Sequence, residues 1–378
     1  MQIEEQGLIF DANGRPETER VACFTSLCPT SSGSILSGFH LGSAKHAPNA
    51  TIRLSRSRDG GRTWKEVAHR FETKFNGVPG SLAGSEMGEV EPGRLMLCTT
   101  WFDRSDPAKP FFDPVTEGVI PSRLLCAFSS DDGETWSGWR QIPAGELKGL
   151  AGCGPILRWS DGRVGYPFES YKEAGDPAPG SHAAWLVLSR DGGRSFGPPQ
   201  LVAKDPRSRV YYWDERLAAG RRPGEFVGLY WTHDLEEKKD LTVHISRGEP
   251  AGDGIRPGPV TATPIPGQIA APLCLDDGRL LAFVVDRNRP ATMTLWSSPD
   301  GGGTWPDRLV VYRHEERSAL SQGAGAKDVD FVQYWEDMAK WSFGHPAIRL
   351  LGPGRVLLAF YAGTPQYMSI HWARVSLF

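Results

Sequence analysis

One eight-residue pattern occurs four times along this chain. It reads S-x-D-x-G-x-[T/S]-[W/F] and begins at Ser57, Ser129, Ser189 and Ser298. In a tight turn the Asp carboxylate accepts backbone N–H groups, and Gly takes the positive φ that other residues avoid. An apolar run precedes each copy, at residues 51–54, 124–128, 184–188 and 293–296. The pattern therefore predicts four equivalent hairpin turns between β-strands, each with its final aromatic residue packed inward.

A second, shorter phrase predicts the number of repeated units. A Gly followed by a polar residue and an apolar run occurs six times, at residues 32–36, 92–96, 161–164, 223–227, 277–281 and 353–357. The third and fourth copies of the longer pattern are about twice as far apart as the earlier copies. We therefore expect one further unit between them that lacks the pattern, with strands at 226–232 and 241–246. Repeats of this kind are typical of β-propellers. We expect an all-β, six-bladed β-propeller of four-stranded blades in one domain, residues 1–378.

Two segments depart from the repeat. Residues 8–10 form a short apolar run ahead of the first unit, and we expect them to pair with the last blade, whose strands are predicted at 356–361 and 369–375. Residues 313–342 interrupt the rhythm, which predicts a long loop insertion with a short helix at 332–340. No apolar period of 3.6 residues persists elsewhere, so helical folds are excluded.

Composition narrows the classes of partner. The formal net charge of −3 gives no basic surface for a nucleic acid or an anionic membrane. Six Cys are scattered without a CxxC pair, which indicates buried thiols rather than a disulfide or metal framework. The first twenty residues lack the apolar segment of a signal peptide, and no apolar run reaches the length of a membrane span. We therefore expect a cytoplasmic protein without a membrane partner.

The four turns and the six-unit count resemble the Asp-box (BNR) repeats of the sialidase superfamily, over the whole chain. Most known members are glycoside hydrolases that release sialic acid. The resemblance implies a site with three arginines on the substrate carboxylate, a Tyr nucleophile with a Glu partner, and an Asp acid/base. An Asp box specifies the scaffold far more strongly than the reaction, so each position has to be compared separately.

Compared in this way, the site departs from the family. Residues 21–26 hold no arginine where the first is expected, and the second is missing from residues 231–234. His46 stands near the Asp position, His345 at the Tyr position, and Glu215 at the Glu position. Arg287 and Arg289 lie where the third arginine is expected. Because a carboxylate clamp depends on bidentate guanidinium pairs, we expect a reaction other than ordinary sialic-acid release.

Polar and aromatic residues near the predicted pocket complete the candidate site. The candidate catalytic residues are His46, Glu215, His345 and Tyr212, and the candidate substrate-binding residues are His40, Glu86, Tyr171, Arg216, His233, Arg287 and Arg289. His titrates near neutrality and suits proton transfer. Aromatic faces beside paired hydrogen-bonding groups are typical of sugar sites.

Three functions remain open. The first is a modified glycoside hydrolase on an acidic or highly hydroxylated small saccharide, with Glu215 as base or nucleophile partner, His46 as acid, and Arg216 and Arg289 as sugar ligands; Glu86, Glu89 or Asp214 is the candidate for the second carboxylate. The second is a lyase on a uronate, with His46 or His345 as base and Tyr171 or Tyr212 as acid. The third is a propeller that binds glycans without catalysis.

No cofactor is expected, and the motifs for phosphate, dinucleotide and serine-hydrolase chemistry are absent from the sequence. One sub-hypothesis for either enzyme is a divalent metal held by three histidines. His46, His233 and His345 are the candidate ligands, and imidazole suits zinc.

Overall fold

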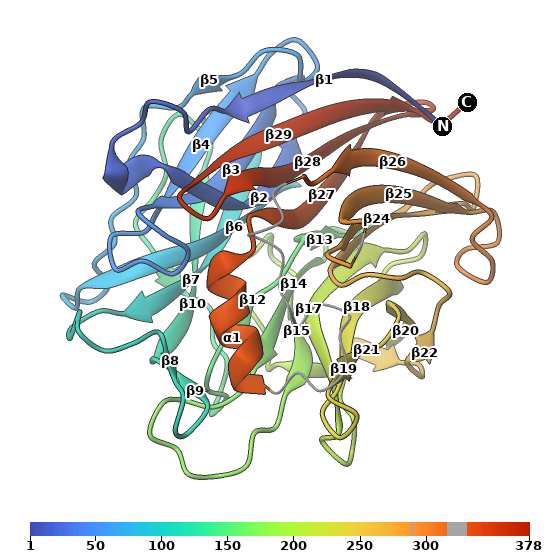
Figure 1. The fold of residues 1–378 in the computed structure, drawn as a ribbon. Helices are drawn as coiled ribbons and strands as arrows, with labels where there is room; N and C mark the ends of the chain where they lie inside the picture. The colour runs from blue at the N-terminus through green and yellow to red at the C-terminus, as the bar shows by residue number, and fades with distance from the viewer. Residues whose placement is uncertain (289, 316–330) are drawn as a thin grey trace.

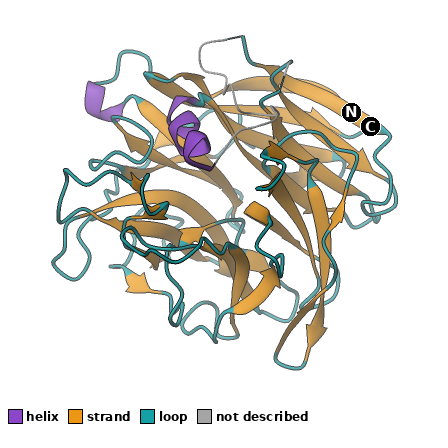
Figure 2. Ribbon diagram, turned by 60° about the horizontal axis from the view of Figure 1, so that its bottom comes forward, coloured by secondary structure: helices purple, strands orange, loops and turns teal. Residues whose placement is uncertain are grey.

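The computed structural model describes residues 1–288, 290–315 and 331–378. This part of the chain is almost entirely β-structure, with one α-helix, α1 (Phe331–Lys340), and a short 3-10 helix at Glu17–Glu19. Figure 1 shows the sheets fanned around a common centre, α1 lying across it, and the two termini side by side. The same arrangement is seen from another side in Figure 2. The predicted all-β class is confirmed.

The strands form meandering antiparallel sheets in chain order. One sheet joins β27 (Phe343–Gly352), β28 (Arg355–Thr364), β29 (Tyr367–Ser376) and β1 (Gln2–Phe10) to β2 (Val21–Pro29), β3 (Ile35–Gly42), β4 (Thr51–Ser57) and β5 (Lys65–Glu66). The next sheet contains β6 (Gly80–Glu91), β7 (Arg94–Asp103), β10 (Ser122–Ser129) and β11 (Arg140–Gln141). Between β7 and β10 the chain forms a separate two-stranded hairpin of β8 (Phe112–Asp113) and β9 (Gly118–Val119).

The remaining sheets repeat this order. The third contains β12 (Ala151–Gly152), β13 (Leu157–Arg158), β14 (Val164–Ser170), β15 (Ala183–Ser189) and β16 (Gln200–Ala203). The fourth contains β17 (Val210–Ala219), β18 (Phe226–Asp234), β19 (Lys239–Asp240), β20 (His244–Ala251), β21 (Gly254–Pro257) and β22 (Thr261–Ala262). The fifth contains β23 (Ala270–Cys274), β24 (Leu280–Asp286), β25 (Thr292–Ser298) and β26 (Asp307–Arg313).

The first strands contact one another in a closed cycle. β2 contacts β6 and β27, β6 contacts β13, β13 contacts β17, β17 contacts β23, and β23 contacts β27. The joint between β2 and β29 is a single parallel pair, Val21 with Met368, so this large sheet consists of two four-stranded groups. β1 pairs along β29 from Gln2 to Phe10, as predicted for residues 8–10.

The two sequence phrases mark two different turns. In the six shorter phrases, Gly33, Gly93, Gly162, Gly224, Gly278 and Gly354 all have positive φ and lie between the first and second strands of a group. The longer pattern lies after β4, β10, β15 and β25 and leads into the outermost strand. In the first copy Asp59 accepts hydrogen bonds from the Thr63 backbone N–H (2.9 Å) and hydroxyl (2.7 Å), and Ser57 donates to Asp59 at 2.7 Å.

The other predictions on architecture have mixed outcomes. The helix expected at 332–340 is confirmed by α1, whereas residues 316–330 of the predicted insertion lie outside the described residues. All six Cys are free thiols, five of them buried. Within the described ranges, no helix has both the length and the apolar character that a membrane crossing requires.

Candidate active site

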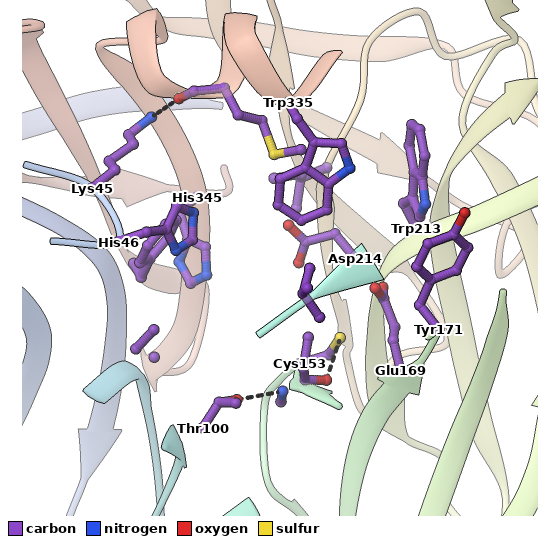
Figure 3. A pocket seen from close by; sticks show the side chains of 18 of the residues that line it. Lys45, His46, Thr100, Cys153, Glu169, Tyr171, Trp213, Asp214, Trp335 and His345 are labelled. Atoms are coloured by element: carbon purple, nitrogen blue, oxygen red, sulfur yellow. Dashed lines mark hydrogen bonds between the residues drawn. The ribbon is translucent and has the colours of Figure 1, made fainter. Parts of the chain in front are cut away.

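A cavity of about 210 Å³ is lined by residues in or next to the first strands and by residues of α1. It receives side chains from every group of strands, and α1 closes one side with Trp335 and Met338. Figure 3 shows His46 and His345 on one side, Trp213 and Tyr171 on the other, and Asp214 between them under Trp335. The cavity is therefore a product of the whole ring rather than of one sheet.

A repeated β-bulge directs residues into this cavity. In β2, β6, β17 and β27 one extra residue interrupts the pairing with the second strand, next to Phe24, Gly84, Asp214 and His345. All four residues have φ between 47° and 75°, and all four line the cavity. A bulge re-aims a side chain that strict alternation would place elsewhere. The non-glycine residues hold an unfavourable backbone conformation, which is common at functional sites.

Arg216 is the centre of a buried network on the cavity floor. Its Nε and Nη2 donate to Asp214 Oδ1 at 3.1 and 2.8 Å, and its Nη1 donates to Glu86 Oε1 at 3.2 Å. Its Nη2 also lies 2.5 Å from His345 Nε2. Gly154 permits this packing, because a Cβ there would lie 2.0 Å from the Glu86 carboxyl carbon. The network fixes Asp214 and His345 relative to each other.

The same network determines the tautomer of His345. A guanidinium can only donate, so His345 Nε2 accepts from Arg216, and Nδ1–H donates to the Thr25 carbonyl at 3.1 Å. Burial first, and then the charge of Arg216, hold the pKa of His345 well below its usual value. His345 is therefore neutral and has both ring nitrogens engaged.

Asp214 is the carboxylate that remains available to a ligand. Both Arg216 bonds go to Oδ1, and Oδ2 has no hydrogen-bond partner among the described residues. The side chain is 26% exposed. Burial raises the pKa of Asp214, and Arg216 acts in the opposite direction. A carboxylate whose pKa moves toward neutrality is suited to proton transfer.

A second carboxylate lies on the wall formed by β14. Glu169 Oε1 accepts from the Glu215 backbone N–H at 3.2 Å, and Oε2 lies 3.2 Å from His182 Nε2. Tyr171 lines the cavity beside it, as Figure 3 shows. This wall presents one carboxylate, one imidazole and one phenol from adjacent strands.

Aromatic rings make up much of the remaining surface. His46 stacks on Phe111 with ring centroids 4.2 Å apart, and Trp335 stacks on Phe112 at 4.8 Å. Burial holds the pKa of His46 well below its usual value, so this ring is neutral. Arg287 lies over Trp341 at 4.2 Å and donates from Nη2 to the Phe343 carbonyl at 3.3 Å. Its Nε and Nη1 have no acceptor among the described residues.

The structure brings together only part of the site expected from sequence. His46, Tyr171, Arg287 and His345 line the cavity. Arg216 bonds to the lining residues Asp214 and His345, and Glu86 bonds to Arg216. His40, Tyr212, Glu215 and His233 are not among the lining residues. Arg289 lies outside the described residues.

Glu215 does not line the cavity, because the bulge exchanges its place with that of Asp214. Glu215 is fully buried between neighbouring strands, where Oε1 accepts from the Trp185 backbone N–H at 3.2 Å. Burial, reinforced by the nearby Glu169, holds its pKa well above the usual value. Asp214 and Glu169 are the carboxylates that face the cavity. A β-bulge leaves no pattern in a single sequence. The only hint that another carboxylate could take this place was Asp214, which directly precedes Glu215.

Tyr212, His233 and His40 lie off the cavity for local reasons. The Tyr212 ring packs against Tyr230 at 5.6 Å, away from the cavity. His233 lies behind Trp213, stacked on it at 5.3 Å, with Nδ1 3.1 Å from Asp240.

Both nitrogens of His40 lie near carbonyl oxygens, those of Leu82 and Ala44, at 3.1 and 3.3 Å. The three histidines of the metal sub-hypothesis are not gathered. Across the described part of the chain there is no group of three or more His, Cys, Asp or Glu side chains able to hold a metal.

Comparison with known proteins agrees with this architecture. No family model matches the chain. A sialidase of Bacteroides fragilis (strain YCH46) is 25% identical over 158 residues, which are 38% of this chain but only 28% of that protein.

Solved structures match over the whole chain at low identity. They include a protein of unknown function from Dyadobacter fermentans DSM 18053 (TM-score 0.72, 17% identity, 100% of this chain and 99% of that one). The Hadza microbial sialidase Hz136 gives a TM-score of 0.68 at 15% identity, covering 98% of this chain and 68% of that one. An α-L-arabinanase of Penicillium chrysogenum, complexed with arabinobiose, gives 0.63 at 13% identity, covering 100% and 99%. The chain therefore has the sialidase-like β-propeller fold, and the resemblance found in the sequence is confirmed at the level of the fold.

Proposed function

We propose that this chain is a single six-bladed β-propeller that cleaves a glycosidic bond in a small saccharide. Six glycine turns and a closed cycle of first strands support the blade count. The cavity lies where the loops of a propeller form a pocket. The neighbours with named activities, two of which are a sialidase and an arabinanase, support a glycoside hydrolase.

The lining supports an acidic or highly hydroxylated sugar. Aromatic faces such as Trp213 and Trp335 suit the apolar faces of a sugar ring. The two unpaired N–H groups of Arg287 need an oxygen acceptor, since a buried donor without one is costly. Residues 21–26 hold no arginine, and His345 stands where the resemblance implies a tyrosine, which supports a substrate or mechanism other than that of ordinary sialidases.

We assign the main catalytic role to Asp214. The observation that carries this proposal is its carboxylate, aimed into the cavity by a bulge, clamped by Arg216 through Oδ1 and open at Oδ2. Asp214 acts as base on the attacking water or as nucleophile on the anomeric carbon, and Glu169 is a second carboxylate that lines the same cavity.

The test is a panel of sialosides, glucuronides and arabinosides with wild-type protein and Asp214→Asn. We expect turnover of at least one glycoside, and a fall in kcat of about 100-fold or more in the variant. Asp253→Asn is the matched control, because Asp253 has a side chain that is 95% exposed, and should leave kcat unchanged. Equal kcat for Asp214→Asn and wild type would contradict the assignment. Binding without turnover would instead favour the non-catalytic glycan-binding protein.

Elimination on a uronate is the second candidate, favoured by one observation. His46 is a neutral imidazole in the cavity wall whose Nδ1 has no partner among the described residues, and Tyr171 lies in the same cavity. A base and a phenol are the groups that remove and return protons in a lyase. An unsaturated product, detected by its ultraviolet absorbance, identifies elimination, whereas a saturated reducing sugar identifies hydrolysis.

A further inference from the structure

A second polar cluster lines the cavity apart from the Arg216 network. It consists of Lys45, from the loop between β3 and β4, Tyr361 of β28, and Arg287, which directly follows β24. Tyr361 pairs with Gly344 of β27, so it lies across the strand from the bulge at His345. The Tyr361 hydroxyl bonds to Lys45 rather than to a member of the Arg216 network.

The bonds of Lys45 determine the direction of the bond to Tyr361. Lys45 Nζ lies 2.8 Å from the Tyr361 hydroxyl, 3.2 Å from the Met338 carbonyl and within bonding distance of the Trp341 carbonyl. An ammonium has three N–H donors and no acceptor. Its three donors match these three oxygens, so Tyr361 accepts from Lys45. Figure 3 shows Lys45 directed toward α1, with one of these hydrogen bonds drawn.

The hydrogen of the Tyr361 hydroxyl is consequently left for the cavity. Tyr361 is only 2% exposed, and no acceptor for its hydroxyl hydrogen is found in the described ranges of the chain. Lys45 and Arg287, the two cations beside the hydroxyl, cannot accept this hydrogen because their charged groups can only donate. A ligand oxygen in the cavity is the acceptor that remains.

Positive charge beside the Tyr361 hydroxyl offsets part of the cost of forming a buried phenolate when this proton leaves. Burial raises the pKa of Tyr361, whereas the Arg287 guanidinium and its hydrogen bond to the hydroxyl act to lower it. Two cations therefore lie beside one phenol oxygen. Fixed positive charge at the point where negative charge develops is a large source of catalysis.

We propose that Tyr361 is the proton donor to the leaving group, with Lys45 as the residue that positions it. This inference rests on the proposed glycosidic cleavage. The Tyr361 proton passes to the glycosidic oxygen as the bond to the anomeric carbon breaks, which releases the alcohol. Water then supplies hydroxide to the sugar and one proton, which returns to the Tyr361 phenolate through Asp214, so the net reaction consumes one water.

The experiment compares two glycosides of the same sugar, a 4-nitrophenyl glycoside and a methyl glycoside. Nitrophenolate leaves without protonation, whereas methanol requires it. Assays are run below pH 7, since burial lowers the pKa of Lys45 to about 7 and the ammonium prevails there. In Tyr361→Phe we expect kcat to fall about 100-fold or more on the methyl glycoside and less than about fivefold on the nitrophenyl glycoside, at similar KM.

The positioning role of Lys45 is tested by the same ratio of kcat on the methyl glycoside to kcat on the nitrophenyl glycoside. Lys45→Met should reproduce the selective loss, and Lys45→Arg, which keeps the donors, should restore most of the rate on the methyl glycoside. Tyr367→Phe is the control, because Tyr367 lies at the end of the same hairpin and is 46% exposed. Circular dichroism and thermal unfolding establish that each variant is folded.

The outcomes separate this inference from the proposed function. Suppose the wild type cleaves both glycosides, and Tyr361→Phe either slows both equally or slows neither. The proton-donor role is then wrong, while the proposed function stands. If the wild type cleaves no glycoside of the panel, the proposed function fails and this inference fails with it.

Discussion

Asp214 and Glu215 are neighbours in the chain, yet their carboxylates have opposite surroundings. Asp214 reaches the cavity with one oxygen clamped by Arg216, and Glu215 is sealed between strands with a pKa held far above its usual value. A positive φ of 47° at Asp214 makes the difference. Chemical role at the residue scale is therefore decided by backbone conformation as much as by residue type.

Histidine burial predicts acid sensitivity. Burial lowers the pKa of His40 from its ordinary 6.5 to about 4, so His40 stays neutral when folded and takes up a proton when unfolded. The unfolded state then binds more protons as pH falls from 6.5 to about 4, and the free energy of unfolding falls by up to about 1.4 kcal/mol per pH unit for this group.

Chemical denaturation of the wild type and His40→Gln across this range measures the effect. The slope of the unfolding free energy against pH should be smaller in the variant, and unchanged in Asp253→Asn. An identical slope in His40→Gln would show that His40 is not the source.

At the scale of elements, two turn types and one bulge recur around the ring. The hydrogen bonds of the longer turn are made within eight residues, as at Ser189, Asp191 and Ser195. The bulge depends on pairing with the next strand and on the contents of the cavity. The turns are consequently readable from sequence, and the bulges are not.

The turns contribute stability rather than chemistry. Asp191 accepts from the Ser189 hydroxyl and from the Ser195 backbone N–H and hydroxyl, at 2.6 to 2.8 Å. Asp191→Ala should lower the free energy of unfolding by about 1–3 kcal/mol, measured in urea, and leave kcat unchanged. A large loss of kcat at full stability would contradict a structural role.

Lys45 should hold α1 in place. Its ammonium donates to the carbonyls of Met338 and Trp341 at the C-terminal end of the helix, where backbone acceptors have no helical partner. In Lys45→Met we expect faster amide hydrogen exchange in the peptide 331–341 than in the wild type. Lys65→Met, at an exposed lysine, is the control, and equal exchange in all three proteins would contradict the contact.

At the scale of the whole molecule, the N-terminal strand completes the sheet that contains the C-terminus. β1 pairs with β29 over its full length and turns Phe10, 3% exposed, into the core against Phe39. Leu8 of the same strand is 41% exposed. This strand covers an edge that would otherwise offer unpaired backbone groups.

The strand contains its own matched pair of substitutions. Phe10→Ala should lower the free energy of unfolding by about 3–5 kcal/mol, because it leaves a cavity in the core. Leu8→Ala should cost less than about 1 kcal/mol. Urea unfolding measures both, and equal costs would argue against closure through this strand.

Local sequence determined the elements of this protein. The turns at Ser57, Ser129, Ser189 and Ser298 and the glycine turns are set by hydrogen bonds and φ preferences within a few residues, so they predict the all-β class and the likeness to sialidases. Residue counting from these turns also placed His46, Arg287 and His345 at the cavity.

Tertiary structure alone decided the site. Asp214 replaced Glu215 because of one extra residue in β17, and Lys45 met Tyr361 across more than three hundred residues of chain. His182 and Trp335 entered the lining through the closure of the ring. Such contacts depend on strand register and on close packing between distant segments, neither of which leaves a periodic signal in a single sequence.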